Sequence, residues 1–374
     1  MMNKREKAFV DEEMGYFFGF PKGRYSEVLQ SMECTRVNSC RTSSIPLAEF
    51  WRPANLGKIG KIFAPRLKGF DPASAQKFFE FPTEATLNGR RIGTPSMTDI
   101  MVLAPGIRMA IEGKFTEYVE YPEPLINAWM SQKISKVLGD GWTPASYKAH
   151  LHNVLKAWIG TIRDAGCTGI EDDGTFFAEC MDVQYQFLHR AASACHEAGM
   201  ATGTTPVLVY QVFFDAKSAE HIEKMERFKA DLGRWAAALR LKDMKFLILT
   251  VPVANAAEVV RRFGDAKRGF FNLMRDKTIY EFDFDGVEID TVLSGRNSSA
   301  AAWPIPSSGS ASGGTRERRG RLPKRRSVTG RSSRSAPSTS RMPCATRSWP
   351  TVRLTSRRIG RRISQDCRER EPLT

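Results

Sequence analysis

The sequence has few of the residues on which common metal sites and phosphate loops depend. Five histidines and seven cysteines are scattered along 374 residues, and no CxxC pair occurs. Without metal-ligand spacing, the cysteines are expected to be reduced, structural thiols. The pattern GxxxxGK[ST] is also missing, which disfavours an enzyme that hydrolyses nucleoside triphosphates.

Long hydrophobic runs are absent as well. The longest, Phe246–Val253, has the length of a strand and is far too short to span a membrane. At the N-terminus the basic segment 1–7 leads into the acidic segment 8–13, which is unlike a signal peptide. We therefore expect a cytoplasmic protein with no membrane partner.

Excess positive charge is missing from most of the chain, although the net charge is +15. Residues 294–374 hold 18 Arg and one Lys against four acidic residues, which leaves 37 basic and 37 acidic residues in 1–293. This tail is a disordered Arg/Ser-rich arm that binds phosphates, a low-complexity linker, or the product of an out-of-frame reading. The charge therefore gives no evidence that the body of the chain binds nucleic acid.

The pattern of apolar residues predicts an α/β protein in which helices flank a mixed central sheet. Residues 1–70 lack periodicity and are expected to be an irregular N-terminal extension with short helices, whereas 71–293 form the main domain. Asp71–Glu80 is predicted to be a helix, because Asp suits the N-cap and Pro the first helical position. Periodicity predicts the remaining elements: strands at 85–92, 98–104, 107–115, 206–214, 245–253 and 278–284, and helices within 125–162 and at 176–198, 219–239 and 256–263.

The segment from Ser96 to Phe115 carries the strongest functional signal. Two apolar runs meet at Pro105–Gly106, so a symmetric hairpin pairs Asp99 with Glu112 and places Lys114 on the same face. Opposed carboxylates repel each other, which a sheet built only for stability avoids. A divalent cation removes this repulsion, and Mg²⁺ typically binds one or two carboxylates together with phosphate oxygens. The alternative is that these residues are ordinary surface charges at strand ends.

Asp99, followed after twelve residues by Glu112-Gly113-Lys114, resembles the active-site motif of the PD-(D/E)XK nuclease superfamily. The resemblance implies a restriction-endonuclease-like core in which Asp99 and Glu112 bind Mg²⁺, with Mn²⁺ as an alternative ion. It further implies that the carbonyl of Gly113 is a ligand and that Lys114 serves the water nucleophile. Thr98 stands where the name-giving proline would be.

Three further residues are candidates through the same resemblance. Many members add an upstream acid, for which Glu84 is the first candidate and Glu80 the second, although an ordinary exposed glutamate fits the spacing equally well. Members of the RecB-like branch carry Gln-x-x-x-Tyr on the following helix. Here Gln184 is followed by Leu188, so the match is partial, and its amide either reaches the active site or bonds a backbone group.

Three histidines give weaker functional signals. His150 and His152 share a face only in a strand, and their surroundings are predicted to be helical, so a zinc pair is disfavoured. His189-Arg190 fits a phosphate contact or a solvated helix face.

Together the patterns predict a metal-dependent nuclease acting on DNA, of restriction or repair type, and compatible with a homodimer. The alternative is a catalytically inactive nucleic-acid-binding or structural member of the same fold.

Overall fold

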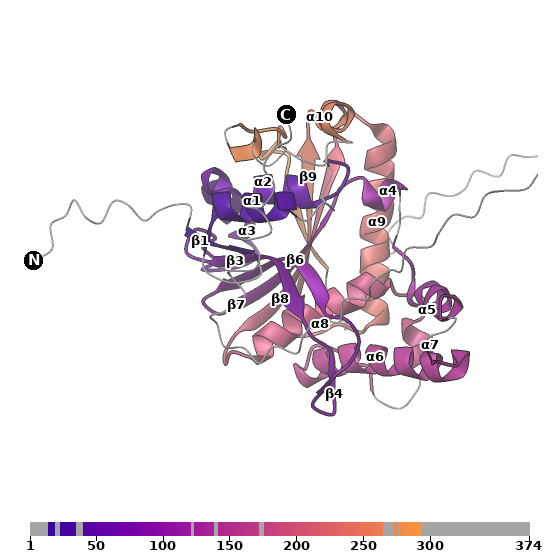
Figure 1. Cartoon of the computed structure of the whole chain (residues 1–374). Coiled ribbons are helices and arrows are strands. Elements are labelled where there is room, and N and C mark those ends of the chain that lie inside the picture. Colours follow the sequence, from indigo (N-terminus) through magenta and orange to yellow (C-terminus); the bar gives the residue numbers. More distant parts are fainter. Residues whose placement is uncertain are drawn as a thin grey trace, which may run out of the picture.

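An eight-stranded mixed sheet runs through the centre of the molecule (Figure 1). The computed structural model describes residues 14–18, 23–34, 40–120, 123–137, 141–171, 176–264, 273–275 and 277–292. The order across the sheet is β10-β9-β8-β7-β6-β3-β1-β2. In chain order these strands are β1 (Met14–Phe18), β2 (Gly23–Arg24), β3 (Gln76–Thr83), β6 (Ser96–Ala104), β7 (Ile107–Lys114), β8 (Thr205–Asp215), β9 (Lys245–Val253) and β10 (Glu288–Val292).

The middle of the sheet combines an antiparallel meander with parallel strands. β3, β6 and β7 pair antiparallel in that order, and β8 and β9 then add parallel to β7. Helices connect β7 to β8 and β8 to β9, as parallel pairing requires. The prediction of an α/β protein with a mixed central sheet flanked by helices is confirmed.

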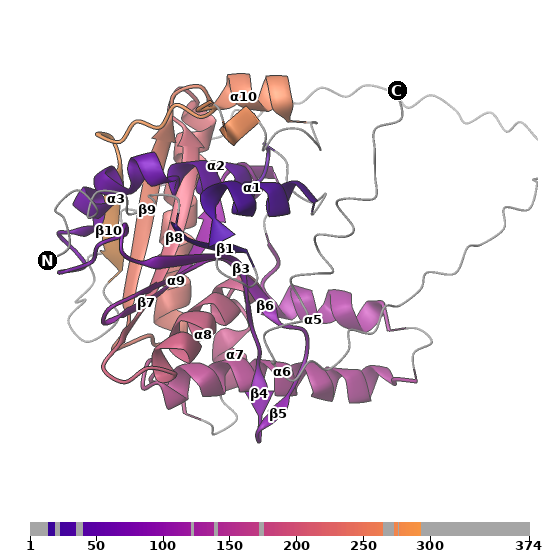
Figure 2. The same ribbon diagram turned by 60° about the vertical axis from the view of Figure 1, so that its left-hand side comes forward.

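Helices cover both faces of the sheet (Figure 2). Each face has its own apolar core. One face packs against α1 (Tyr25–Cys34), α2 (Ser44–Phe50), α3 (Leu56–Phe63) and α10 (Ala256–Phe263), with the short helix η1 (Pro53–Asn55) between α2 and α3. The other face packs against α5 (Ile126–Ser135), α6 (Pro144–Asp164), α7 (Phe176–Cys180), α8 (Tyr185–Gly199) and α9 (Ala219–Ala238), and α4 (Glu117–Glu120) lies beside α9. The side chains of β8 are buried on both faces, as its continuous hydrophobicity predicted.

The β6–β7 hairpin has the predicted register. Its pairs run from Ile100↔Ile111 to Ala104↔Ile107, so each pair sums to 211. Gly106 adopts a φ of +70°, a left-handed conformation that glycine enters without steric cost. The hairpin therefore directs alternate side chains to the two cores and fixes which face receives the charged residues at its open end.

Two local predictions near the start of the main domain are wrong. The segment expected to be the helix Asp71–Glu80 turns after Asp71, whose Oδ1 accepts a hydrogen bond from the N–H of Ala73, and then enters β3. Burial of Phe78 in one core and Phe79 in the other outweighs the helix-start signal. The strand expected at 85–92 is only the small hairpin of β4 (Thr86–Leu87) and β5 (Arg90–Arg91).

Other boundaries also differ from the expectations. The predicted helix at 176–198 is interrupted, since α7 ends at Cys180 and α8 begins at Tyr185. The predicted strand at 278–284 forms only the single bridge Val253↔Phe282, and the last described strand is β10.

Among the described helices none is long and apolar enough to cross a membrane. The tail at 294–374 lies outside the described residues.

Packing shows no separation at residue 70. β1 pairs in parallel with β3, and the helices α1 to α3 share one apolar core with β6, β7 and β8. Tyr16 illustrates the connection, because its hydroxyl donates to the carbonyl of Trp51 at 2.7 Å while its ring stacks on Phe79. The described part of 1–70 thus contains the expected short helices but belongs to the same core as the rest.

Candidate active site

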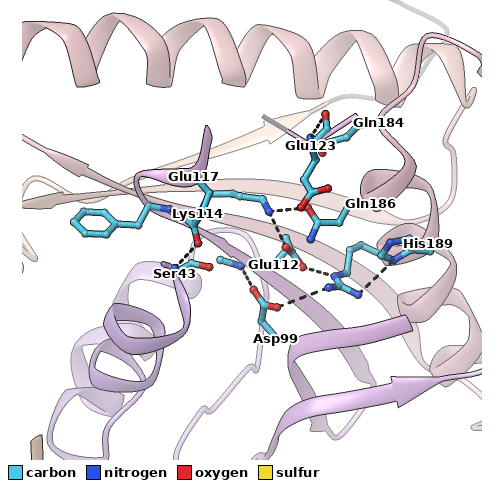
Figure 3. Close-up of polar contacts among 12 residues, drawn as sticks. Ser43, Asp99, Glu112, Lys114, Glu117, Glu123, Gln184, Gln186 and His189 are labelled. Carbon is cyan, nitrogen blue, oxygen red and sulfur yellow. Dashed lines mark hydrogen bonds and ion pairs between the residues drawn. The ribbon is translucent and has the colours of Figure 1, made fainter. Parts of the chain in front are cut away.

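Three sequence-predicted residues come together at the open end of the β6–β7 hairpin (Figure 3). The Nζ of Lys114 donates to the Oε1 of Glu112 at 2.9 Å. The backbone N–H of Gly113 donates to the Oδ2 of Asp99, also at 2.9 Å. Glu112 and Lys114 are nearly inaccessible, with side-chain exposures of 2% and 7%, so their charges interact through a medium of low polarity.

Glycine at position 113 is explained by the opposite face of β7. A Cβ built there would lie 3.0 Å from the Cβ of Ser43 and 3.1 Å from the Cδ2 of Leu47, at the start of α2. Strand alternation directs Glu112 and Lys114 toward α8 and leaves position 113 against α2. The Glu-Gly-Lys sequence therefore places its two charged side chains on the face toward α8 and the residue without a side chain on the face that packs closely against α2.

An arginine from α8 joins the two carboxylates. The Nε of Arg190 bonds to the Oε2 of Glu112, and its Nη2 lies 3.7 Å from the Oδ1 of Asp99. Arg190 is buried, so the solvated-face interpretation of His189-Arg190 does not hold for the arginine. The chain itself thus supplies a cation at the position where repulsion between opposed acids led us to expect a metal ion.

A glutamine that the sequence analysis did not identify contacts the lysine. The Oε1 of Gln186 accepts from the Nζ of Lys114 at 2.6 Å. Gln186 and Arg190 are four residues apart on α8 and therefore lie on the same helix face. This spacing of two polar residues was a signal in the sequence that could have identified both.

Gln184, the candidate taken from the resemblance, makes different contacts from those of Gln186. It is the residue before α8 begins, and its Nε2 approaches the carbonyl oxygen of Glu123 at 3.5 Å. Its Oε1 is buried and has no hydrogen-bond partner among the described residues. The amide is therefore near a backbone group, as one of the two interpretations expected, whereas Gln186 contacts the lysine.

Of the two candidate upstream acids, the second, Glu80, lies beside the cluster. The β3–β6 pairs Phe79↔Ile100 and Phe81↔Thr98 flank Glu80, which places it across from Asp99. Its φ of +50° interrupts the regular strand there.

Charge effects also link Glu80 to the site. Burial raises the pKa of Glu80, Arg190 opposes this rise, and Glu112 adds to it. Glu84, the first candidate, is half-exposed and pairs with Arg91 at 2.8 Å. Three acids on the adjacent strands β3, β6 and β7, namely Glu80, Asp99 and Glu112, thus interact electrostatically, and Glu84 lies outside this group.

The acids and bases of the cluster differ in their ease of ionisation. Burial, and then the neighbouring Glu112, raise the pKa of Asp99 well above its usual range. Burial also opposes ionisation of Glu112, but Arg190 and Lys114 offset it, so the pKa of Glu112 is lowered. For Lys114, burial is likewise overcome, chiefly by Glu112, and its pKa is raised. Lys114 is therefore a cation at neutral pH.

A pocket opens beside Lys114. It has a volume of about 570 Å³ and lies between α5, the start of α8 and α9. Its charged lining residues are balanced in number, since Lys114, Lys224 and Arg227 are basic and Glu117, Glu123 and Asp231 are acidic. Lys114 therefore connects the pocket to the charged cluster, but the lining as a whole has no excess of positive charge.

The oxygens of the site are compatible with Mg²⁺ in kind. Mg²⁺ is usually held by one or two carboxylates and keeps several waters, and Asp99 and Glu112 supply two carboxylates in one place. No group of three His, Cys, Asp or Glu side chains that could hold a metal ion is found in the described part of the chain. The donor set therefore fits a metal that keeps most of its waters, provided that it replaces the guanidinium of Arg190 between the two acids.

The fold and this cluster define an α/β protein with a buried acid–base centre at the end of a central hairpin. A family model described as a domain of unknown function (DUF6946) matches residues 25–252, which is more than half of the chain. The chain therefore belongs to that family, and the matched region contains the whole charged cluster. Neither a curated protein nor a solved structure matches the chain.

Proposed function

We propose that this protein is a Mg²⁺-dependent nuclease that hydrolyses phosphodiester bonds of DNA. The observation that carries the proposal is the convergence of Asp99, Glu112 and Lys114 at the end of the β6–β7 hairpin, where Lys114 also lines a pocket. The order of a helical segment, the β3–β6–β7 meander, a helix and the parallel strand β8 supports a restriction-endonuclease-like core.

Each residue of the cluster has a role in this proposal. Asp99 and Glu112 would hold the metal, with the carbonyl of Gly113 as a further ligand. A bound Mg²⁺ supplies a Lewis acid for the phosphate and lowers the pKa of a bound water. Because its pKa is raised, Lys114 acts as a cation that orients the water and balances charge on the phosphate, rather than as the base. Gln186 holds its amine in place.

Arg190 takes two roles in sequence. It pairs with the Glu112 carboxylate and lies 3.7 Å from Asp99 while no metal is bound, which avoids the large cost of an unpaired buried carboxylate at Glu112. If Asp99 and Glu112 held a metal, the guanidinium of Arg190 would be released, and its planar set of donors matches phosphate oxygens. Arg190 would then stabilise the phosphodiester.

The position of Arg190 also favours a second candidate function. With Glu112 already paired to an internal cation, the protein could bind nucleic acid through the pocket beside Lys114 without cleaving it. Lys224 and Arg227, which line the pocket, would then contact phosphates.

Cleavage assays separate the two candidates. Supercoiled and linear DNA are incubated with the wild-type protein in Mg²⁺ or in EDTA, and with the variant Lys114→Ala. Lys68→Ala, which removes an exposed lysine, is the matched control. We expect cleavage only with Mg²⁺, a loss of at least about 100-fold in Lys114→Ala, and no loss in the control. Binding without cleavage by any of the proteins would favour the second candidate.

A further inference from the structure

A second pocket lies on the other side of the charged cluster. It has a volume of about 190 Å³ and is lined by six aromatic rings, which we call the aromatic pocket: Trp129, Tyr147, His150, Trp158, Tyr185 and His189. Pockets for drug-sized molecules are about 300–1,000 Å³, so this one suits a smaller, flat group.

Two rings of the aromatic pocket stack on each other, and a third contacts this pair. Trp129 from α5 stacks on Tyr185 from α8, with ring centroids 3.8 Å apart and planes at 10°. The Nε1 of Trp158 reaches the hydroxyl of Tyr185 at 3.4 Å, which connects α6 to this pair. Three helices thus hold the rings in fixed positions, and a planar ligand would pay little ordering cost on the protein side.

The charges in the pocket lining exclude one class of ligand. No acidic side chain lines the aromatic pocket, and the only charged lining group is the ammonium of Lys133. Lys133 has no ion-pair partner among the residues that the structure describes. An alkylated ammonium ligand, which aromatic cages can bind, would be repelled here. A neutral aromatic ring attached to an anion, which is what a nucleotide offers, is attracted.

The aromatic pocket shares a wall with the proposed catalytic cluster. Arg190 can only donate, and its Nη1 bonds to the Oγ of Ser96 at 2.6 Å. Ser96 therefore directs its own hydrogen to the Nδ1 of His189, 2.7 Å away. This places the proton of a neutral His189 on Nε2, where no described residue accepts it, so a ligand in the pocket would find a donor.

We propose that the aromatic pocket binds one unpaired base of a nucleic-acid strand whose phosphate lies at the Asp99–Glu112–Lys114 cluster. The position of the phosphate rests on the proposed function, whereas binding of the base does not. A base in a duplex must leave its stack to enter such a pocket, which costs free energy. The protein therefore prefers single-stranded, gapped or flapped DNA to an intact duplex.

Binding without cleavage tests this proposal. The full chain carrying Lys114→Ala is titrated in EDTA with a single-stranded oligodeoxynucleotide that contains one 2-aminopurine, with the same oligonucleotide made abasic at that position, and with the matching duplex. We expect tightest binding to the intact single strand, together with quenching of the 2-aminopurine. Stacking of one base corresponds to about 5- to 150-fold in affinity, which is the expected gap between the intact and abasic strands.

Protein variants locate the effect. Trp129→Leu is expected to remove the gap between the intact and abasic strands, and so is His150→Ala, which serves as a second variant should the first fail to fold. Trp142→Leu changes an exposed tryptophan that contacts His150 but does not line the pocket, so it keeps the gap. Equal binding of intact and abasic strands by the parent protein would overturn the proposal, as would a gap that survives in both pocket variants.

The two proposals can fail separately. If Mg²⁺ never supports cleavage but the intact strand still binds more tightly than the abasic one, the proposed function fails and the base pocket stands. If cleavage depends on Mg²⁺ and Lys114 but all three DNA probes bind equally, the pocket proposal fails alone.

Discussion

Removal of the Arg190 side chain is the perturbation with the largest effect that the structure allows us to estimate. The variant Arg190→Met keeps an unbranched apolar chain but leaves Asp99 and Glu112 without their guanidinium. The Arg190 and Glu112 side chains are 5% and 2% exposed, so the pair is buried. Breaking a buried pair by removing one partner costs about 3–5 kcal/mol.

Lys114 moderates this cost, because it still bonds to Glu112 in the variant. We therefore expect a loss near the lower limit, about 3 kcal/mol, which corresponds to a fall in Tm of about 6–12 °C for a domain of this size. The matched control is Arg227→Met. It removes an exposed arginine paired with Glu223, where both side chains are more than 60% exposed, so the expected loss is below about 1 kcal/mol.

Thermal unfolding with and without Mg²⁺ tests whether the freed acids form a metal site. A metal at 100 times its Kd stabilises the folded state by about 2.7 kcal/mol. Mg²⁺ should raise the Tm of Arg190→Met more than that of the wild type, in which the metal must first displace the guanidinium. A loss below about 1 kcal/mol in EDTA, or the same Mg²⁺ shift in Arg190→Met and Arg227→Met, would refute this reasoning.

Three other predictions follow from single contacts. Gly113→Ala places a Cβ 3.0–3.1 Å from side-chain atoms at the start of α2 and should lower the free energy of unfolding by about 1–3 kcal/mol, as measured by urea denaturation. Burial raises the pKa of Glu49 to about 7, against the pull of two hydrogen bonds from the N–H groups at 279–280. The folded state then binds this proton more tightly than the unfolded chain, so the contribution of Glu49 to stability is fully present below pH 4.5 and falls by about 3 kcal/mol as the pH rises to 7. Urea titrations of the wild type and of Glu49→Gln across that range should show this fall in the wild type relative to the variant, and parallel profiles would contradict it. Glu80→Gln should lower Mg²⁺-dependent cleavage more than Glu84→Gln, because only Glu80 lies across from Asp99; equal losses would contradict this placement.

The hairpin at the centre of the site could be predicted because its signals are local. Pro105–Gly106 fixes the turn, and the apolar runs on each side fix the register, so the closeness of Asp99 and Glu112 follows from counting. The strands β8 and β9 could be predicted equally well from the sequence, since their hydrophobicity is nearly continuous. Whether the hairpin binds a metal stays a prediction.

The rest of the site depends on contacts between distant segments. Arg190 reaches Glu112 across 78 positions of the sequence, and no short-range pattern reports such a distance. The helix expected at Asp71–Glu80 failed for a similar reason, because tertiary burial of the phenylalanines of β3 outweighs a local helix-start signal. Glu80 could be ranked against Glu84 only once β3 had been placed beside β6.

The most direct test of the central claim is the rate of DNA cleavage as a function of Mg²⁺ concentration, measured for the wild type and for Lys114→Ala under identical conditions. The account predicts a wild-type rate that rises with Mg²⁺ to saturation and vanishes in EDTA, and a rate at least about 100-fold lower at every Mg²⁺ concentration in the variant. Equal rates for the two proteins, or wild-type cleavage that persists in EDTA, would contradict it.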